Sequence, residues 1–361
     1  MQLDIKKNVI LAPYTTLHVG GVADYVVEVA SLEEVKSACK WAQQTGTPPL
    51  ILGGGSNVLI ADGQLHRLVI INKIMGIAYT ASDTHTLVKA GAGEGWDSLV
   101  ETLVNQGFAG LENLSGIPGS VGAAPVQNIN AYGVSVADSI QSVEVYDMVA
   151  DTFRVLSGTE CHFGYRDSIF KREEGKHLVV ISVTFKVTTT TAKNISYRSA
   201  SQSIERYLSE NNISSPTVAD VRQAVLHVRS NIGMLLGQFR SAGSFFKNTV
   251  VSAEKFAAIE EAVRREFLEI SEQLSPWHWT LPTGEEKIAT AFLLECSPYN
   301  KNTYGNKRWN DVIGISPKHS LSIVTFDGAT AADVHDFVQE IKTAVRNIFD
   351  VTLETEVDFI S

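Results

Sequence analysis

The sequence predicts a mixed fold of helices and strands divided over two or three subdomains. The chain has 361 residues, 44% of them hydrophobic, which is enough to bury more than one core. Its apolar residues change repeatedly between helical and strand spacing, and no internal repeat is present. Two glycine-rich segments, at 53–57 and 116–133, stand between the periodic stretches.

The first helix is expected to begin after Ser31. Ser31 and Glu34 form a capping-box pattern ahead of an apolar stripe, and Gly46 follows as a stop signal. The next elements are expected to be a strand at 67–72, a strand at 86–90 and a helix at 97–106 ended by Gly107.

The second half continues this alternation and ends on a strand pattern. Thr330 and Asp333 precede a long apolar stripe, which predicts a helix over 331–349. The remaining expected elements are strands at 142–147, 178–187 and 351–360, a linker at 188–191, and helices near 216–228 and 252–267.

Composition narrows the class of protein. The net charge is −10 and the chain has no run of lysine or arginine, so nucleic acid and anionic membrane surfaces are not expected as partners. The three cysteines are far apart and lack metal-ligand spacing, which argues against a disulfide framework or a metal site. No signal peptide or membrane span is expected. These features predict a cytoplasmic protein with no metal.

The segment 116–133, GIPGSVGAAPVQNINAYG, is too long and too glycine-rich for an ordinary connector. Structureless loops of this length in compact domains are usually functional. Gly116, Gly119 and Gly122 leave the backbone free to lie against a ligand, and a large, flat or anionic ligand suits such a surface. A bland surface loop is the alternative.

The second cluster is the turn 53–57, which lies between two apolar runs that read as strands. It lacks the spaced glycines of a Rossmann fingerprint, and no Gly-Lys-Ser/Thr follows as in a P-loop. Its successive N–H groups could instead form a nest for a diphosphate. A simple hairpin turn explains the turn equally well when it is taken alone, but two such segments favour a dinucleotide held without a Rossmann fold.

Six motifs, in this order, resemble those of the UDP-N-acetylenolpyruvoylglucosamine reductase family. They are TTLHVGG (15–21), LGGGSN (52–57), GIPGSVGAAPVQNINAYG (116–133), GYRDSIFK (164–171), AGSFFKN (242–248) and LETEVDFI (353–360). The resemblance covers nearly all of the chain. It implies an α+β fold, with a two-lobed FAD-binding module of the type shared with vanillyl-alcohol oxidase and a separate α+β substrate-binding domain. The implied parts are a first lobe (1–72), a second lobe (73–229), a substrate domain (230–345) and a strand returning to the FAD module (346–361).

The resemblance also implies the activity. A member of this family uses NADPH and non-covalent FAD to reduce UDP-N-acetylglucosamine-enolpyruvate to UDP-N-acetylmuramate for peptidoglycan synthesis, and a monomer is expected. The positions expected to contact FAD are Gly53, Gly54, Gly55, Ser56, Asn57, Gly116, Ile117, Pro118, Gly119, Gly122, Ala123, Ala124, Gln127, Asn128, Tyr132 and Gly133.

Three catalytic residues come from three remote segments. An arginine such as Arg166, beside Asp167, is usually part of a structural ion pair, but the resemblance implies that it faces the substrate carboxylate, where its planar fork suits charge stabilisation. Ser244 would ordinarily be a turn residue. By resemblance it is the general acid, with Lys247 easing its deprotonation.

The third catalytic residue is a glutamate near the end of the sequence. Glu354 and Glu356 would share one face of a strand, so periodicity does not choose between them. The Glu-Val pair of the family favours Glu356. An edge-strand acid that blunts sheet pairing is the alternative.

Further positions are carried over as substrate contacts: Tyr165, Tyr197, Arg229, Lys247 and Asn248. Tyr197 matches a tyrosine that closes over the nucleotide in one subgroup of the family.

Some positions depart from the family. Asn130 replaces a glycine and is expected to tolerate positive φ. Ile232 replaces a lysine, and Arg240, or less directly Lys301 or Lys307, could supply the lost charge.

Two other functions remain open at this point. The chain could be another FAD-dependent oxidoreductase of the same fold, or a non-catalytic descendant that binds FAD or a UDP-sugar. The presence of Arg166, Ser244 and Glu356 together argues against both.

Overall fold

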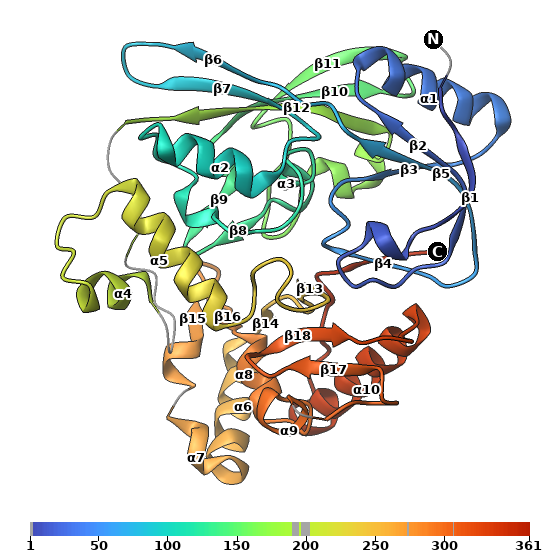
Figure 1. Ribbon diagram of the computed structural model, residues 1–361. Helices are drawn as coiled ribbons and strands as arrows, with labels where there is room; N and C mark the ends of the chain where they lie inside the picture. The colour runs from blue at the N-terminus through green and yellow to red at the C-terminus, as the bar shows by residue number, and fades with distance from the viewer. Residues whose placement is uncertain (1–2, 190–194, 196–202, 273, 306) are drawn as a thin grey trace.

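The computed structural model describes residues 3–189, 195, 203–272, 274–305 and 307–361. Two larger sheets from the N-terminal half lie at the top of Figure 1, and a C-terminal unit of smaller sheets and helices, running from β13 to α10, packs below them. The predicted α+β class is confirmed. Among the helices that the structure describes, none is long and apolar enough to cross a membrane.

The first sheet has four strands in the order β1-β2-β5-β3. They are β1 (Lys6–Ile10), β2 (Val22–Val29), β3 (Pro49–Leu52) and β5 (Gln64–Asn72). Helix α1 (Leu32–Thr45) packs on this sheet. The hydroxyl of Ser31 accepts from the Glu34 N–H at 3.2 Å, as predicted. The Glu34 carboxylate instead accepts from the N–H of Ala30, one residue before the partner that a capping box uses.

The glycine-rich turn 53–57 joins β3 to β4 (Val58–Ile60), but these two strands do not pair with each other. β3 pairs with β5, whereas β4 pairs in parallel with β19 (Asp358–Ile360). The hairpin interpretation of the turn is therefore wrong. Because its two flanking strands pair with different strands, residues 53–57 connect them without forming a hairpin turn.

The second sheet has five strands in the order β11-β10-β12-β7-β6. They are β6 (Ile77–Ala81), β7 (Thr86–Gly91), β10 (Ile140–Asp147), β11 (Thr152–Ser157) and β12 (Leu178–Val187). Helix α2 (Trp96–Asn105) buries Trp96 against this sheet, where the indole N–H donates to the carbonyl of Leu114 at 2.9 Å.

The segment 116–133 is more ordered than its composition predicts. It contains a single helical turn, α3 (Ala124–Gln127), and the strand β8 (Asn130–Ala131), which forms a hairpin with β9 (Val134–Ser135). Tyr132 and Gly133 take φ of 49° and 77° in the two-residue turn. The left-handed asparagine is Asn128, with φ 44°, and not Asn130, which lies in β8. The expectation for Asn130 was wrong because pairing with β9 keeps it extended.

Two helices lead from the second sheet to the C-terminal unit: α4 (Ile204–Glu210) and α5 (Val218–Asn231). The guanidinium of Arg222, on α5, donates to both carboxylate oxygens of Asp97 at 2.6 and 3.0 Å. The same carboxylate accepts from the N–H of Gly116 at 2.6 Å. Asp97 therefore fixes α5 to the start of the segment 116–133.

The C-terminal unit contains two three-stranded sheets, in the orders β13-β18-β17 and β14-β16-β15. Its strands are β13 (Ser241–Ser244), β14 (Thr249–Val251), β15 (His278–Thr280), β16 (Glu286–Ile288), β17 (Ile313–Ser316) and β18 (His319–Thr325). Its helices are α6 (Ala253–Glu266), α7 (Leu268–Ser271), α8 (Thr290–Glu295), α9 (Lys301–Tyr304) and α10 (Ala331–Phe349).

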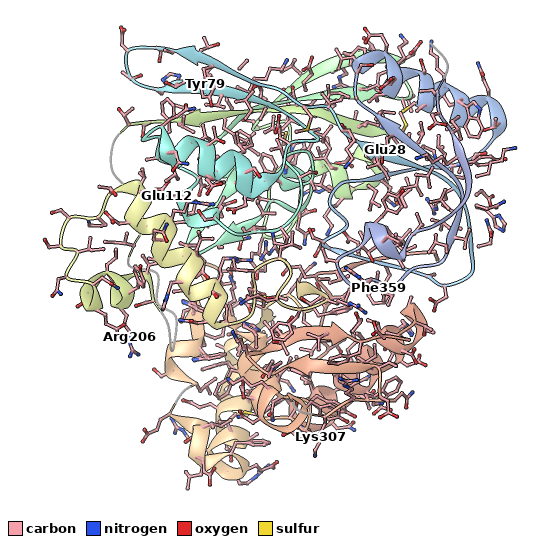
Figure 2. All side chains as sticks on the ribbon, in the orientation of Figure 1. Glu28, Tyr79, Glu112, Arg206, Lys307 and Phe359 are labelled. Carbon is pink, nitrogen blue, oxygen red and sulfur yellow. The ribbon has the colours of Figure 1, made fainter. Side chains whose placement is uncertain are left out.

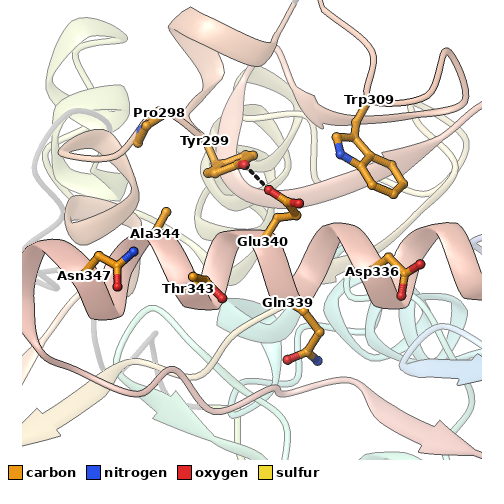
Figure 3. Close-up of a pocket in the computed structure, with 9 residues that line it drawn as sticks. All are labelled: Pro298, Tyr299, Trp309, Asp336, Gln339, Glu340, Thr343, Ala344 and Asn347. Atoms are coloured by element: carbon orange, nitrogen blue, oxygen red, sulfur yellow. Dashed lines mark hydrogen bonds between the residues drawn. The ribbon is translucent and has the colours of Figure 1, made fainter.

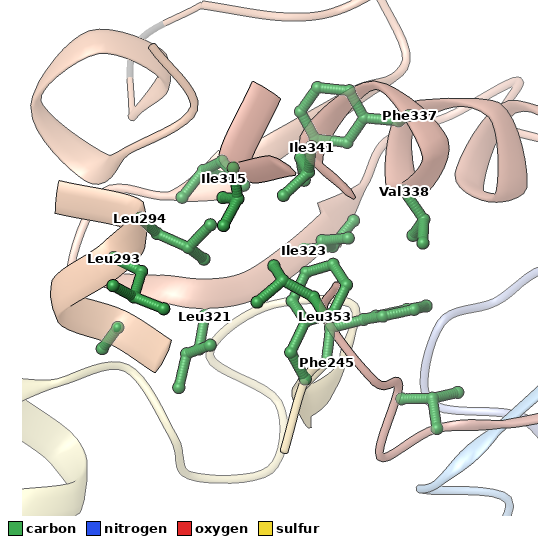
Figure 4. Packing of buried hydrophobic residues seen from close by; sticks show 14 of the residues in the cluster. Phe245, Leu293, Leu294, Ile315, Leu321, Ile323, Phe337, Val338, Ile341 and Leu353 are labelled. Atoms are coloured by element: carbon green, nitrogen blue, oxygen red, sulfur yellow. The ribbon is translucent and has the colours of Figure 1, made fainter. Parts of the chain in front are cut away.

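The core of this unit forms between its sheets and α10. Phe245, Ile323 and Phe337 belong to a buried cluster that also takes in Leu17 and Leu59 from the N-terminal half. Figure 4 shows Phe245, Ile323 and Phe337 among the packed side chains of this cluster. The shared core joins the C-terminal unit to β4 and to the segment before β2 in the N-terminal half. The division of the chain at 72, 229 and 345 stays a prediction.

The predicted strands at 67–72, 86–90, 142–147 and 178–187 and the predicted helices are confirmed to within a few residues at their ends. The final strand is shorter than expected, since only 358–360 is a strand and Thr355 makes an isolated bridge to Phe246. Residues 190 and 191 of the expected linker lie outside the described residues. Phe359 lies between the upper sheets and the C-terminal unit (Figure 2).

Candidate active site

A cavity of about 610 Å³ lies where the segment 128–138, the turn 163–166 and the C-terminal unit meet. Its lining brings together the three expected catalytic residues, Arg166, Ser244 and Glu356. The other expected site residues that line it are Asn128, Tyr132, Gly133, Tyr165 and Asn248.

Arg166 is positioned by a tight turn. Gly164 and Asp167 exchange backbone hydrogen bonds of 2.9 and 3.2 Å, and Arg166 between them takes φ 51°. Asp167 does not pair with Arg166. Its carboxylate accepts from Arg172 at 2.6 Å, and this pair lowers the pKa of Asp167. The structural ion pair with Asp167 is therefore ruled out for Arg166, whose side chain is free to turn into the cavity.

The guanidinium of Arg166 meets the carboxylate of Glu356 across the cavity wall, with 3.0 Å between Nε and Oε1. The two charged groups are close enough for an ion pair, but the N–H is not aimed at the oxygen, so Arg166 Nε has no hydrogen-bond partner. A buried donor without an acceptor is costly in a folded protein. Because Arg166 also lines the cavity, its guanidinium lies where a ligand carboxylate could reach it.

Glu356 is held through its backbone. Its N–H donates to the carbonyl of Phe245 at 2.9 Å, and its carbonyl accepts from the Asn57 amide at 3.1 Å and the Gln127 amide at 3.4 Å. Burial raises the pKa of the Glu356 carboxyl, and the nearby charge of Arg166 opposes this shift. A carboxyl with a raised pKa can hold a proton that it then donates.

Glu354 lies elsewhere. Its side chain is 74% exposed and accepts from Lys247 Nζ at 3.2 Å, outside the cavity lining. Because residues 351–357 are not a strand, the two glutamates do not share a face as expected. Lys247 pairs with this exposed acid and does not line the cavity, so its assistance to Ser244 stays a prediction.

Ser244 ends β13 and lies directly opposite Ser322 on β18. Gly243 before it takes φ 75°, which a residue with a side chain rarely adopts. The Ser244 hydroxyl makes no hydrogen bond to any residue that the structure describes and faces the cavity rim. It is therefore available to a bound molecule.

Lys287, on β16, is a cavity residue that no sequence motif indicated. Its Nζ lies 4.1 Å from the ring centre of Tyr165 and 5.8 Å from that of Trp279. Burial, and then the charge of Arg166, lower its pKa. The only sequence signal was local: Lys287 is a single lysine that follows two glutamates and precedes an apolar run.

The two glycine-rich segments touch each other directly. A Cβ on Gly54 would lie 2.8 Å from the Cα of Gly119, and the Ser56 hydroxyl donates to the carbonyl of Pro118 at 3.2 Å. Gly122 has a different role from the one expected. A Cβ there would meet the Cβ of Ala92 at 2.6 Å, so this glycine permits packing between segments of the protein itself.

These segments also provide donors without acceptors. None of the peptide N–H groups of 53–57 donates to an acceptor in the described part of the chain. Beside them, the buried hydroxyl of Thr16 has no partner, and the Thr16 N–H donates to the Gly55 carbonyl at 3.1 Å. Consecutive free N–H groups with a buried hydroxyl suit a diphosphate. The residues present therefore fit FAD.

The remaining expected contacts are scattered. The guanidinium of Arg229 is buried, donates to the Met234 carbonyl at 2.9 Å and leaves its Nε unpaired, but it does not line the cavity. Arg240 pairs with Asp327 at 2.6 Å on the surface. Tyr197 lies outside the described residues.

A second hollow, of about 650 Å³, lies on the outer face of α10. Figure 3 shows Tyr299 donating to Glu340 across it, at 2.7 Å. Burial and this contact raise the pKa of Tyr299. None of the expected site residues lines this hollow, and its acids, Asp336 and Glu340, are both exposed, so it offers no comparable chemistry.

Comparison with known proteins agrees with this geometry. The family model described as FAD binding domain matches residues 23–155, and that of the UDP-N-acetylenolpyruvoylglucosamine reductase C-terminal domain matches 235–360. A reductase of this name from Thermobifida fusca is 38% identical over 99% of this chain and 98% of its own. One from Xanthomonas euvesicatoria pv. vesicatoria is 35% identical over 96% and 93%.

Among solved structures, UDP-N-acetylenolpyruvylglucosamine reductase (MurB) from Thermus caldophilus is 25% identical over the full length of both chains, with a TM-score of 0.63. An FAD-binding domain joined to a cavity lined by a guanidinium, a buried carboxyl and a hydroxyl defines a flavin-dependent oxidoreductase. The chain belongs to the UDP-N-acetylenolpyruvoylglucosamine reductase family. The expected family, enzyme class and FAD cofactor are thereby confirmed.

Proposed function

We propose that the cavity reduces the enolpyruvyl group of UDP-N-acetylglucosamine-enolpyruvate to give UDP-N-acetylmuramate, with Arg166, Glu356 and Ser244 around the reacting carbons. NADPH is the reductant, and the product serves peptidoglycan synthesis. The observation that carries the proposal is the pairing of Arg166 with Glu356 beside an unbonded serine hydroxyl. When bound, FAD supplies the hydride-transfer chemistry, with its diphosphate on the N–H groups of 53–57.

Arg166 binds the substrate carboxylate. Hydride addition to the terminal vinyl carbon breaks the C=C π bond and leaves an electron pair on the carbon next to the carboxylate, which spreads into its oxygens. Arg166 lines the cavity, where its Nε lies 3.0 Å from Glu356 Oε1. A preorganised guanidinium stabilises this charge more than water would, because it needs no reorientation as the charge forms.

Glu356 acts in its protonated form. Burial raises the pKa of its carboxyl, which favours the protonated form against the opposing charge of Arg166, and in that form the carboxyl can donate a hydrogen bond to the substrate. The carbonyl contacts to Asn57 and Gln127 fix its place relative to the FAD module.

Ser244 donates the proton that completes the reduction. Its O–H bond breaks as a C–H bond forms on the carbon that carries the electron pair, and solvent then restores the hydroxyl proton. Lys287 lines the cavity together with Arg166, whereas Lys247 does not, so Lys287 takes the electrostatic role first expected of Lys247. Asn248 and Tyr165 complete the wall against the sugar and phosphates.

A cytoplasmic, monomeric enzyme with no nucleic-acid partner completes the proposal. The three cysteines are unpaired and buried, and burial raises the pKa of each thiol to about 12, which keeps them unreactive. Unpaired thiols are typical of a reducing compartment.

The decisive experiment is anaerobic. NADPH should bleach the bound flavin, and UDP-N-acetylglucosamine-enolpyruvate should then restore its colour. Reoxidation by a sugar-free acceptor alone would indicate another oxidoreductase of the same fold. A flavin that NADPH does not bleach would indicate a binding protein, and either result overturns the proposal.

A further inference from the structure

We propose that Lys171 is a positioning residue for Glu356, acting through Gln127 and the return strand β19. Lys171 ends a short 3₁₀ turn (Ile169–Lys171) that closely follows Arg166. Its ammonium does not line the cavity. The proposal rests on the function proposed above for Glu356.

Lys171 makes two contacts that converge on Glu356. Its Nζ donates to the Gln127 side-chain oxygen at 2.9 Å and lies 3.2 Å from the Asp358 carboxylate. Gln127 in turn donates through Nε2 to the carbonyl of Glu356, and Asp358 lies two residues further along the chain, at the start of β19. One ammonium is thus linked to the Glu356 carbonyl, through Gln127, and to the residue at the start of β19 that follows it.

Gln127 is committed to this role. Its side chain is buried, and its oxygen and nitrogen are both used by protein groups. If the amide were turned over, Lys171 would face an N–H₂ group and the Glu356 carbonyl would face an oxygen. The lysine therefore fixes the orientation of the Gln127 amide. Through this amide it also fixes the position of the Glu356 backbone relative to Arg166.

Lys171 also affects the charge of the site. The cations that face Glu356 are Arg166 from the turn, Lys171 from the 3₁₀ segment and Lys247 beyond β13, with Lys287 across the same cavity. Asp358, two residues further along the chain, is the acid that pairs with Lys171. Burial raises the pKa of Glu356 and Lys171 opposes that shift. Without the ammonium, Glu356 would keep its proton to a higher pH.

The test compares Lys171→Met with Lys171→Arg. In Lys171→Met, kcat should fall between about tenfold and a hundredfold, the cost of misplacing a reacting group by up to ~1 Å. Bleaching by NADPH should be unchanged, and the alkaline limb of the kcat profile should move to higher pH. Lys171→Arg should restore most of kcat and return the limb. Lys176→Met is the matched control, because Lys176 pairs only with Glu173 on the surface.

A second variant separates positioning from a general fault in folding. Gln127→Leu should lower kcat by a similar factor, and the double variant with Lys171→Met should lose no more than the worse single one, because both act on one chain of contacts. Additive losses, or a loss in Lys171→Met with an unmoved pH limb and no rescue by arginine, would overturn the inference. If Lys171→Met had the wild-type kcat while Glu356→Gln had a lowered kcat, the inference about Lys171 would be overturned and the proposed function would stand. A fully active Glu356→Gln would remove both.

Discussion

Ser244 on β13 stands directly opposite Ser322 on β18, and the buried hydroxyl of Ser322 has no hydrogen-bond partner. The proposed proton donor is therefore placed by a strand pair and not by a hydrogen bond to its own hydroxyl. A donor held in this way keeps its position when the proton leaves, because the backbone ladder does not depend on the side chain.

Ser244→Ala should separate the two halves of the reaction. Flavin bleaching by NADPH should stay close to the wild-type rate, whereas reoxidation by the enolpyruvyl substrate should slow by at least ~10²-fold, the lower end of what a positioned general acid contributes. Stopped-flow absorbance measures both. Equal damage to the two halves would make Ser244 a structural residue. Ser322→Ala is the companion control and should alter neither half by more than a few-fold.

Glu356→Gln should impair the substrate half of the reaction and Glu354→Gln should not. Glutamine can still donate a hydrogen bond but cannot hold an exchangeable acid proton, so we expect a loss of about tenfold or more, below the 10²–10³-fold cost of removing a charge-stabilising donor outright. The alkaline limb of kcat should disappear as well. Glu354 is an exposed partner of Lys247, which makes it the matched control. The reverse order of effects would show that the wrong glutamate has been assigned.

The buried carboxyl of Glu356 also gives a pH-dependent stability. Its pKa in the folded protein is raised by burial, so between the unfolded and folded pKa values the folded state binds more protons and stability falls as pH rises. Glu356→Gln removes this dependence. The difference in melting temperature, variant minus wild type, should therefore grow as pH rises through the folded pKa. A difference that is flat with pH would contradict the burial effect.

Lys287→Met should weaken the binding of anionic ligands. Lys287 faces the cavity across Tyr165 and has no ion-pair partner among the described residues. The apparent KM for NADPH or the UDP-sugar should rise by roughly tenfold, or about 1.4 kcal/mol, and the effect should shrink as salt is added. Arg240→Ala is the control, since Arg240 is held by Asp327 at the surface. A larger effect for Arg240→Ala would show that Arg240, and not Lys287, supplies the charge that is lost at Ile232.

Gly54→Val should yield colourless protein. Its Cβ would lie 2.8 Å from the Cα of Gly119, so the two glycine-rich segments would be forced apart where the diphosphate is proposed to bind. FAD content after denaturation measures the loss, and a circular dichroism melt confirms that the chain folds. Full retention of FAD would place the diphosphate elsewhere.

The sequence predicted the elements whose interactions are local in the chain, and it failed where the interactions join remote residues. Helix α10 was predictable because its start depends on Thr330 and Asp333, three residues apart, and on a regular apolar stripe. The strand pattern at 351–360 misled, because residues 351–357 are held by separate contacts to Phe245, Asn57 and Gln127 and not by a neighbouring strand.

The site shows the same limit. Arg166, Ser244 and Glu356 were found through family motifs, and the fold brings them into one cavity. Lys287 and Lys171 act through partners that are remote in the chain, Tyr165 in one case and Asp358 in the other. No local spacing encodes such partners, so only the folded arrangement could reveal them.

The parallel pair of β4 and β19 has a consequence for how the enzyme fails. This pair is three residues long, and β19, which holds the backbone just beyond Glu356, leaves Phe359 44% exposed, whereas Leu59 and Ile60 of β4 are buried. Short peripheral pairs open at a lower free energy than the whole protein. Mild denaturant should therefore silence turnover while circular dichroism and bound flavin still report a native chain, so that activity is the earliest gauge of damage.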